Sequence, residues 1–530
     1  MTSQGQAQAH AQAAPLLAPG DANGTTSAAH QAHFVFVPLN EHGHLIPAVD
    51  TALLLATHGA LCTIAAPVST AKRVRHTVDA ARASGLPVRL AEFPLDYAAS
   101  GLPEGADDAA TGDHRIDPAH MMSYYRAVSL LRAPIERYLR AHAPPFTFPT
   151  CVVSDFFNPW TTELASSLGV PRLSFFSMSA FSVLCHHNLE RFHAYDGVED
   201  TNQPVVVPGL PEEERTVVVT RAQAPGFLRS VPIPEWLELG DYIERARAEA
   251  DGVIMNTVLE MEPEYVAGYE EARGFKVWTV GPVSLYHQGA KTLASRGSDT
   301  LAIGAAECLR WLDGKDPGSV VYVSFGSIAQ AGPKQVVELG LGLEASGHPF
   351  IWVVRNADDV YDEEVRGALR EIEERVEGRG LLVRGWAPQV AILSHAAVGG
   401  FVTHCGWNST LEAITAGLPV VTWPHFTDQF LNEKMAVEVL GIGVSVGVKE
   451  PLTYQAVAKE IVVGRDVVEE AVRSVMGDGE EAQERRRRAR ALADKAKAAV
   501  REGGSSHANL LDLVKRFAST ASQASAPSAT

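Results

Sequence analysis

The chain has 530 residues, of which 46% are apolar and 20% charged, and its formal net charge is −18 at pH 7. This length exceeds one compact core, so two domains of ordinary size are expected. The acidic excess argues against a nucleic-acid partner or an anionic membrane surface. One basic run, Arg485 to Arg488, could mark a polyanion site, but neighbouring glutamates and alanines favour a solvated helix face.

The remaining bulk features indicate a cytoplasmic protein. The five cysteines are odd in number and scattered without metal-ligand spacing, which is typical of reduced thiols. Residues 1–32 and 518–530 are expected to be disordered tails, and the first lacks the pattern of a secretory signal. No apolar run reaches about 18 residues, so no membrane span is expected. A monomer is the simplest expectation.

Apolar runs followed by helical segments recur along the chain, which is typical of parallel α/β sheets. In the first half, strands are expected at 33–39, 61–65, 151–154, 173–176, 252–255 and 277–280, with a helix at 46–57. A second series is expected at 320–324, 350–354, 381–383, 400–403 and 420–422. Weak periodicity over 283–304 predicts a linker between an N-terminal domain, 33–282, and a C-terminal domain, 305–508. Ligands of such sheets bind beyond the carboxyl ends of the strands, here in a cleft between the domains.

The 44 residues from Trp386 to Gln429 are the most informative segment. They indicate a strand, a glycine-containing turn at 404–408, a helix at 409–416 and a second strand. A strand that enters a helix through such a turn directs backbone N–H groups and the positive helix end at one point, which suits a phosphate. Ser409 and Glu412 also fit a capping box, which needs no ligand.

Aromatic and polar side chains complete this pattern. Trp386 and Trp407 supply aromatic plates, although either could be ordinary core. Asp428 and Gln429 pair a carboxylate with an amide, a combination that can hold adjacent sugar hydroxyls. The segment therefore predicts a pocket for a nucleotide joined to a sugar.

The same segment closely resembles the C-terminal signature of the plant family 1 UDP-glycosyltransferases, and the resemblance extends over about residues 33–517. It implies the GT-B fold, with two tandem Rossmann-like domains and an interdomain cleft. The N-terminal domain would bind an apolar or aromatic acceptor and the C-terminal domain the UDP-sugar. The last helix, about 509–517, would pack back on the N-terminal domain.

The resemblance also implies a role for each donor-site residue. Trp386 would lie under the uracil, with the Ala387 backbone at the base edge and Gln389 near the ribose. The other implied contacts are Ser327, His404, Asn408 and Ser409 at the diphosphate, Glu412 at the ribose, and Trp407, Asp428 and Gln429 at the sugar. In the family a final Gln is associated with glucose donors, and a Trp at the position of Trp407 fits a neutral hexose. The predicted donor is UDP-glucose, with no metal required. His404 could instead be a satisfied buried histidine.

Transfer of a glycosyl group to a hydroxyl needs a base, and a neutral imidazole suits neutral pH. His44 is expected in the turn before a helix, whose N-terminus disfavours the imidazolium. Of the neighbouring His33, His42 and His44, it is His44 that matches the family's base. Asp155 is expected just after a buried strand, where a carboxylate is costly unless paired. It matches the family's dyad aspartate, although it could instead cap the following helix. The resemblance implies an inverting displacement.

The acceptor is less well defined. Candidate lining residues, each of which could equally be core, are Phe156, Phe157, Trp160, Phe175, Phe176, Met178 and Phe181. The sequence looks closest to the plant group that glucosylates flavonoids, other phenolics and terpenoids in secondary metabolism. A flavonoid-type phenolic is the predicted acceptor, and a terpenoid or steroid alcohol is the alternative. A non-catalytic sugar-nucleotide-binding protein is a further alternative. A nicotinamide-dependent oxidoreductase is excluded, because no G-x-G-x-x-G follows the first strand.

Overall fold

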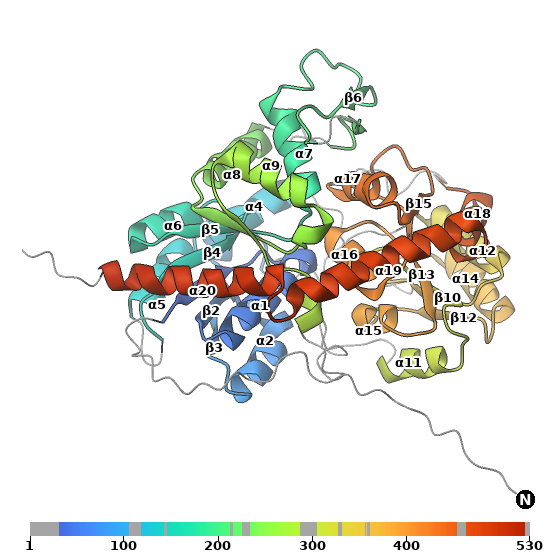
Figure 1. Ribbon diagram of the computed structural model, residues 1–530, viewed down its shortest axis with the longest axis horizontal. Helices are drawn as coiled ribbons and strands as arrows, with labels where there is room; N and C mark the ends of the chain where they lie inside the picture. The colour runs from blue at the N-terminus through green and yellow to red at the C-terminus, as the bar shows by residue number, and fades with distance from the viewer. Residues whose placement is uncertain are drawn as a thin grey trace, which may run out of the picture.

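The computed structural model describes residues 31–104, 118–141, 146–211, 216–224, 234–286, 305–326, 331–355, 357, 361–452 and 463–524. Two parallel sheets form the centres of two lobes (Figure 1). The first has the strand order β3-β2-β1-β4-β5-β8-β9 and the second β12-β11-β10-β13-β14-β15. The prediction of two tandem Rossmann-like domains is confirmed.

The strands of the first sheet are β1 (His33–Val37), β2 (Leu61–Pro67), β3 (Val88–Phe93), β4 (Cys151–Asp155), β5 (Arg172–Phe176), β8 (Gly252–Met255) and β9 (Val277–Thr279). Around it lie α1 (His42–Thr57), α2 (Val68–Ala83), α3 (Tyr97–Ser100), α4 (Pro118–Ser129), α5 (Arg132–Arg140), α6 (Thr161–Leu168), α7 (Ala180–Arg191), α8 (Pro234–Ala248) and α9 (Pro263–Arg273). A small hairpin, β6 (Pro204–Val206) and β7 (Val218–Thr220), and two 3-10 turns, η2 (Leu259–Met261) and η3 (Val283–Tyr286), complete this part. Strands β1, β2, β4, β5, β8 and β9 are buried along their whole length, as expected of a parallel sheet covered on both faces.

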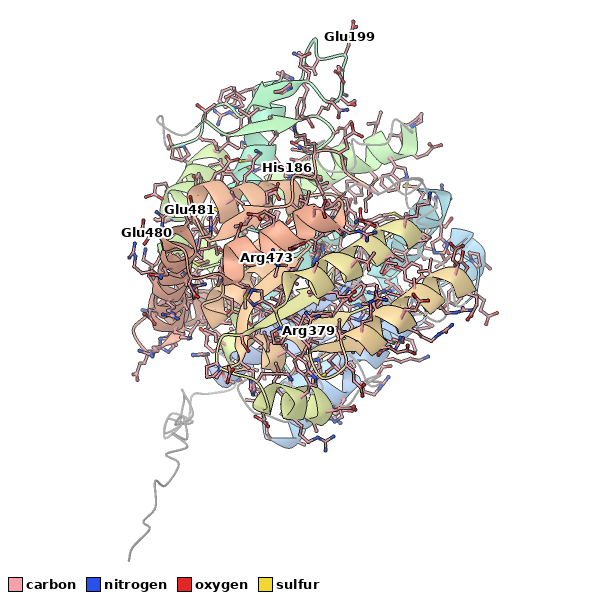
Figure 2. The ribbon with its side chains drawn as sticks, turned by 90° about the vertical axis from the view of Figure 1, so that its right-hand side faces the viewer. His186, Glu199, Arg379, Arg473, Glu480 and Glu481 are labelled. Carbon is pink, nitrogen blue, oxygen red and sulfur yellow. The ribbon has the colours of Figure 1, made fainter. Side chains whose placement is uncertain are left out.

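The second sheet contains β10 (Val320–Ser324), β11 (Phe350–Val353), β12 (Gly380–Val383), β13 (Val398–Thr403), β14 (Val420–Thr422) and β15 (Gly443–Ser445). Its helices are α11 (Ala305–Asp313), α12 (Pro333–Ser346), α14 (Glu363–Arg375), α15 (Gln389–Leu393), α16 (Trp407–Ala416), α17 (Gln429–Lys434) with the π-helical turn η4 (Met435–Val439), α18 (Arg465–Met476), α19 (Glu480–Val500) and α20 (Ser505–Ala524). At the carboxyl end of α12, Arg379 donates to the Glu344 carbonyl at 3.0 Å and Arg473 to the Ala345 carbonyl at 3.1 Å (Figure 2). These arginines satisfy carbonyls that the last turn of a helix leaves free.

The last two helices connect the lobes (Figure 1). Helix α20 leaves the second domain and places Leu510, Leu513 and Phe517 in the hydrophobic core around β1. Asp512 accepts hydrogen bonds from Lys276 and from the indole of Trp278, both at 2.7 Å. The helix continues to Ala524, so residues 518–524 are helical and not the disordered tail that was expected.

Helix α19 carries the basic run. Two acidic residues in its first turn, Glu480 and Glu481, lie at the positive end of the helix (Figure 2). Arg487 and Arg488 both pair with Glu484, at 2.7 and 2.8 Å. The interpretation of this run as a solvated helix face is confirmed for Arg487 and Arg488, whereas Arg485 and Arg486 are partly buried and donate to backbone carbonyls at the end of α18.

Several expected features differ from the structure or lie outside it. Helix α1 begins at His42, four residues before the expected start, so the histidines of the first turn are part of the helix. Of the expected linker, residues 283–286 form η3, and residues 287–304 lie outside the described ranges, as do residues 1–30. No helix in the described ranges is both long and apolar enough to cross a membrane.

Candidate active site at the domain boundary

The predicted base and its carboxylate partner come together at the carboxyl end of β4. Nδ1 of His44 lies 2.8 Å from Oδ2 of Asp155, whose side chain is fully buried. The other carboxylate oxygen accepts a hydrogen bond from the backbone N–H of Phe157 at 3.0 Å. Helix α6 begins only at Thr161, with Trp160 as its N-cap, so Asp155 caps no helix. Both oxygens of the carboxylate are therefore engaged, one with the turn and one with the imidazole.

The surroundings of His44 favour the protonated form of its ring more strongly than water favours that of a free imidazole. Burial lowers the pKa of His44, but the charge and hydrogen bond of Asp155, together with the charges of Glu41 and Asp428, outweigh burial and raise this pKa above 6.5. The helix N-terminus was expected to disfavour the imidazolium, whereas the nearby carboxylates raise the pKa of His44. A carboxylate acceptor at Nδ1 requires the proton there, which leaves the lone pair on Nε2.

Aromatic side chains flank His44. The rings of Phe156 and Phe157 each lie 5.9 Å from the His44 ring, and Phe156 stacks on Phe176 at 4.7 Å. Of the candidate acceptor-lining residues, Phe157 is partly exposed. The others are buried in the hydrophobic core: Phe156, Trp160, Phe175, Phe176, Met178 and Phe181. Their alternative interpretation as core is the one the structure supports.

In the C-terminal domain, the turn between β13 and α16 forms tightly around His404. Cys405 has a φ of 65°, and Gly406 is the N-cap of α16. A Cβ on Gly326 would lie 2.6 Å from the His404 ring, and one on Gly406 would overlap that ring, so the imidazole fits only between glycines. Burial lowers the pKa of His404 to about 3, and its Nδ1 atom is buried without a hydrogen-bond partner. His404 is thus a neutral imidazole at the mouth of α16, and Ser327, one residue beyond Gly326, lies outside the described residues.

Three predicted donor residues share one hydrogen-bonded cluster. Nε2 of Gln389 donates to Oγ of Ser409 at 3.0 Å and to a carboxylate oxygen of Glu412 at 2.9 Å. The alternative interpretation of Ser409 and Glu412 as a capping box is wrong, because α16 begins two residues before Ser409 with Gly406 as its N-cap and without a side-chain cap. Ser409 is free to present its hydroxyl elsewhere because the glycine turn already provides the helix start.

The two signature tryptophans have different environments. Trp386 is half-buried, and its ring lies 5.1 Å from that of His42 in the N-terminal domain. Ala387, next to it, is buried. Trp407 is fully buried, and its indole N–H donates to the backbone carbonyl of Asn256 at 2.9 Å. Trp407 therefore makes a contact between the domains, whereas its predicted role toward the sugar stays a prediction.

The residues that end the signature are fixed by local hydrogen bonds. Asp428 accepts from Asn432 Nδ2 at 2.8 Å and from Thr427 at 3.1 Å, and burial raises its pKa. Oε1 of Gln429 accepts from the backbone N–H of His425 at 2.8 Å and of Phe426 at 3.2 Å. The amide oxygen of Gln429 thus shapes the loop that carries Asp428.

Asparagines connect these parts, and two of them, Asn256 and Asn432, were missed by the sequence analysis. Asn408 donates to the backbone carbonyl of Gly43 at 2.5 Å and accepts from Asn256 at 3.0 Å. Asn432, fully buried, donates to the Cys405 carbonyl at 2.9 Å and accepts from Ser179 of the N-terminal domain at 3.0 Å. The position of Asn256 directly after a buried strand was an available signal, since Asp155 was found by the same rule.

The described residues contain no group of three or more His, Cys, Asp or Glu side chains arranged to hold a metal ion. Metal independence stays a prediction. Cys405, in the signature turn, is buried, and burial raises the pKa of its thiol well above its ordinary value. A buried thiol held in the protonated form is a packing residue, in agreement with its interpretation from sequence.

Two Rossmann-like domains, with an imidazole–carboxylate pair on one and a glycine-lined helix mouth facing it from the other, define a glycosyltransferase of the GT-B class. A family model described as "UDP-glucoronosyl and UDP-glucosyl transferase" matches residues 310–470, and one described as "Glycosyltransferase, N-terminal domain" matches residues 30–285. UDP-glycosyltransferase 73C5 of Arabidopsis thaliana is 42% identical over 91% of this chain and 96% of its own length. The chain belongs to the plant family 1 UDP-glycosyltransferases and is an enzyme of this class.

Solved structures agree with this assignment. Glycyrrhiza uralensis UGT73P12, complexed with glycyrrhetinic acid 3-O-monoglucuronide, is 36% identical and superimposes with a TM-score of 0.83 over 93% of this chain and 97% of its own. Phytolacca americana UGT2, complexed with UDP-2fluoro-glucose and pterostilbene, is 27% identical, with a TM-score of 0.70 over 92% of this chain and 99% of its own. Both relatives hold small molecules within the same fold, and the second holds a UDP-sugar.

Proposed function

We propose that the protein is an inverting, UDP-glucose-dependent O-glucosyltransferase that acts on a hydroxyl of a plant small molecule, with a flavonoid or related phenolic as the acceptor. The observation that carries this proposal is the 2.8 Å contact between His44 and the buried Asp155. This pair lies one residue from Gly43, whose carbonyl is bonded to Asn408 at the mouth of α16. Base and donor helix therefore adjoin one another, as a direct transfer requires.

The proposed reaction is a single displacement. Nε2 of His44 takes the proton of the acceptor hydroxyl while the hydroxyl oxygen forms a bond to the anomeric carbon. The bond between that carbon and the phosphate oxygen breaks, and UDP leaves with the electron pair. Asp155 stabilises the imidazolium that forms at His44, since it accepts the hydrogen bond from Nδ1. Attack opposite the leaving group converts the α-linked donor into a β-glucoside.

The proposed contacts to the diphosphate of the UDP-sugar come from neutral hydrogen-bond donors and from one helix N-terminus. His404, Asn408, Ser409 and the N-terminus of α16 would stabilise the charge on the departing UDP. Ser327 is proposed as a further diphosphate contact. No step requires a metal ion, because these groups supply the stabilisation that a cation would otherwise provide.

The remaining contacts concern the nucleoside and the sugar. Trp386 and the Ala387 backbone would hold the uracil, and Glu412 with Gln389 the ribose. Trp407, Asp428 and Gln429 would surround the glucose. Glu412 and Asp428 supply carboxylate acceptors, and hydroxyls are the donors that such acceptors bind well.

The test is a transfer assay with purified protein, UDP-glucose and a panel that includes quercetin, pterostilbene, glycyrrhetinic acid and a steroid alcohol. Products are separated and identified by mass spectrometry, and their anomeric configuration is determined by NMR. A β-glucoside of quercetin or pterostilbene, absent with His44→Ala, is expected. An α-glucoside would refute inversion, and full activity of His44→Ala would refute the base.

The same assay compares the alternative acceptor class and alternative UDP-sugar donors. Faster transfer to glycyrrhetinic acid or the steroid than to the phenolics would replace the phenolic proposal by a terpenoid or steroid alcohol. The complex of UGT73P12 with glycyrrhetinic acid 3-O-monoglucuronide is the observation that favours this alternative. UDP-galactose and UDP-glucuronic acid are compared as donors, and a higher kcat/KM with either would refute the choice of UDP-glucose.

A further inference from the structure

Asn256 lies directly after β8, outside the signature segment, and is 3% exposed. Its backbone carbonyl accepts from the Trp407 indole at 2.9 Å, and its backbone N–H donates to the Phe176 carbonyl at 2.9 Å. Its side-chain amide accepts from the backbone N–H of Val283 at 3.1 Å and donates to Asn408 at 3.0 Å. One residue of the N-terminal domain thus holds the start of the interdomain segment and two residues of the donor helix α16.

The direction of these hydrogen bonds is fixed by chemistry. A backbone N–H can only donate, so the atom of Asn256 that faces Val283 must be the amide oxygen, and its NH2 group must face Asn408. The atom of Asn408 that receives this NH2 is then the amide oxygen. The NH2 group of Asn408 is consequently left to face the Gly43 carbonyl, 2.5 Å away.

This relay ends beside the base. Gly43 precedes His44 in the first turn of α1, and a carbonyl oxygen accepts well from an NH2 group but repels another oxygen. Reversal of the Asn408 amide would place its oxygen against the Gly43 carbonyl and push α1 away from α16. The orientation of Asn256 therefore decides whether the donor helix attracts or repels the turn that carries His44.

We propose that Asn256 is a positioning residue, which holds the donor helix and His44 at reacting distance across the domain boundary by fixing the amide of Asn408. The inference rests on the proposed role of His44 as base. Asn256 touches neither reacting atom, and it acts through Asn408 and Gly43. Because small misplacements of reacting groups are costly, its loss lowers kcat on the order of 10- to 100-fold.

The experiment is a double-mutant cycle on kcat at saturating UDP-glucose and acceptor, with Asn256→Ala, Asn408→Ala and the double variant. If Asn256 acts through Asn408, the double variant is no slower than Asn408→Ala alone, within about twofold. Multiplying effects in the double variant, or a wild-type kcat for folded Asn256→Ala, would overturn the proposal. Should Asn256→Ala fail to fold, Asn256→Ser replaces it under the same criteria.

Asn509→Ala is the matched control. Asn509 of α20 also donates its amide to the N-terminal domain, at 3.0 Å from the Thr279 carbonyl, but it lies outside the proposed site. Its loss lowers Tm and leaves kcat unchanged, and an equal fall in kcat for both variants would show that Asn256 merely stabilises the fold. His44→Ala distinguishes failure of the proposed base from failure of the proposed role of Asn256. A fully active His44→Ala removes the base assignment, whereas an inactive His44→Ala beside a fully active Asn256→Ala removes this inference alone.

Discussion

Replacement of Asp155 by asparagine tests the dyad most directly, because the substitution keeps the shape of the side chain. One carboxylate oxygen already accepts from the Phe157 N–H at 3.0 Å, and the other faces His44 Nδ1 at 2.8 Å. In Asp155→Asn, the introduced amide oxygen is expected to keep the Phe157 hydrogen bond, and its NH2 group then faces His44. Nδ1 must become the acceptor, which moves the imidazole proton to Nε2, the atom that has to receive the acceptor proton.

The expected fall in kcat follows from the loss of the hydrogen bond between the Asp155 carboxylate and His44. A hydrogen bond to a charged group contributes about 1.5–3 kcal/mol. The imidazolium that forms at His44 also loses a buried counter-charge, so a total of about 3–4 kcal/mol is expected. Each 1.36 kcal/mol changes a rate about tenfold, which gives a fall in kcat of roughly 10²- to 10³-fold for Asp155→Asn.

The assay is initial-rate glucoside formation with both substrates saturating, together with calorimetric titration of UDP. UDP affinity is expected to stay within about threefold, because the carboxylate is not among the proposed donor contacts. Asp512→Asn is the control, since Asp512 also accepts two hydrogen bonds, from Lys276 and Trp278, at the remote helix α20. A kcat for Asp155→Asn within about threefold of the wild type would refute the dyad.

Four further outcomes are expected. Because His44 must be neutral to act and its pKa is raised, kcat/KM should fall toward low pH with an apparent pKa above 6.5. Asp155→Asn should move this acidic limb of the pH profile to lower pH. An acidic limb that does not move would show that another group titrates. Gly406→Ala should weaken UDP binding by about tenfold or more in calorimetric titration, because its Cβ would displace the His404 ring, whereas Gly479→Ala, with no atom within 4 Å of its Cβ, should bind normally. Glu412→Ala should raise the Kd of UDP roughly 10- to 100-fold through loss of a charged acceptor, and no change would remove Glu412 from the ribose site. Dialysis against EDTA should leave the transfer rate unchanged, and a loss restored by Mg²⁺ would contradict the metal-free proposal.

The sequence by itself predicted the two-domain fold and the residue types of the proposed site. Fully buried strands are short, nearly continuous apolar runs with clear flanks, so β8 and β10 were predicted with their observed bounds, 252–255 and 320–324. His44 and Asp155 were paired from residue type, from their places after strands and from the family resemblance, although 111 positions separate them. The glycine-containing turn between a predicted strand and a predicted helix identified the mouth of α16, and the structure shows that a Cβ on Gly406 would overlap the His404 ring.

Tertiary structure alone decided how those parts act on one another. The N-cap of α16 is Gly406 and not Ser409, although the local sequence also fits a capping box at Ser409 and Glu412. Burial lowers the pKa of His44, but this pKa is raised overall because Asp155 and Asp428, distant in sequence, add their charges to that of the nearby Glu41. The relay from Asn256 through Asn408 to Gly43 joins three segments, and an asparagine amide carries no sequence signal of which partner it will meet. The sequence gives the chemical type of each side chain. The interaction energy between two side chains depends on the distance between them, which is fixed only when the two domains pack together.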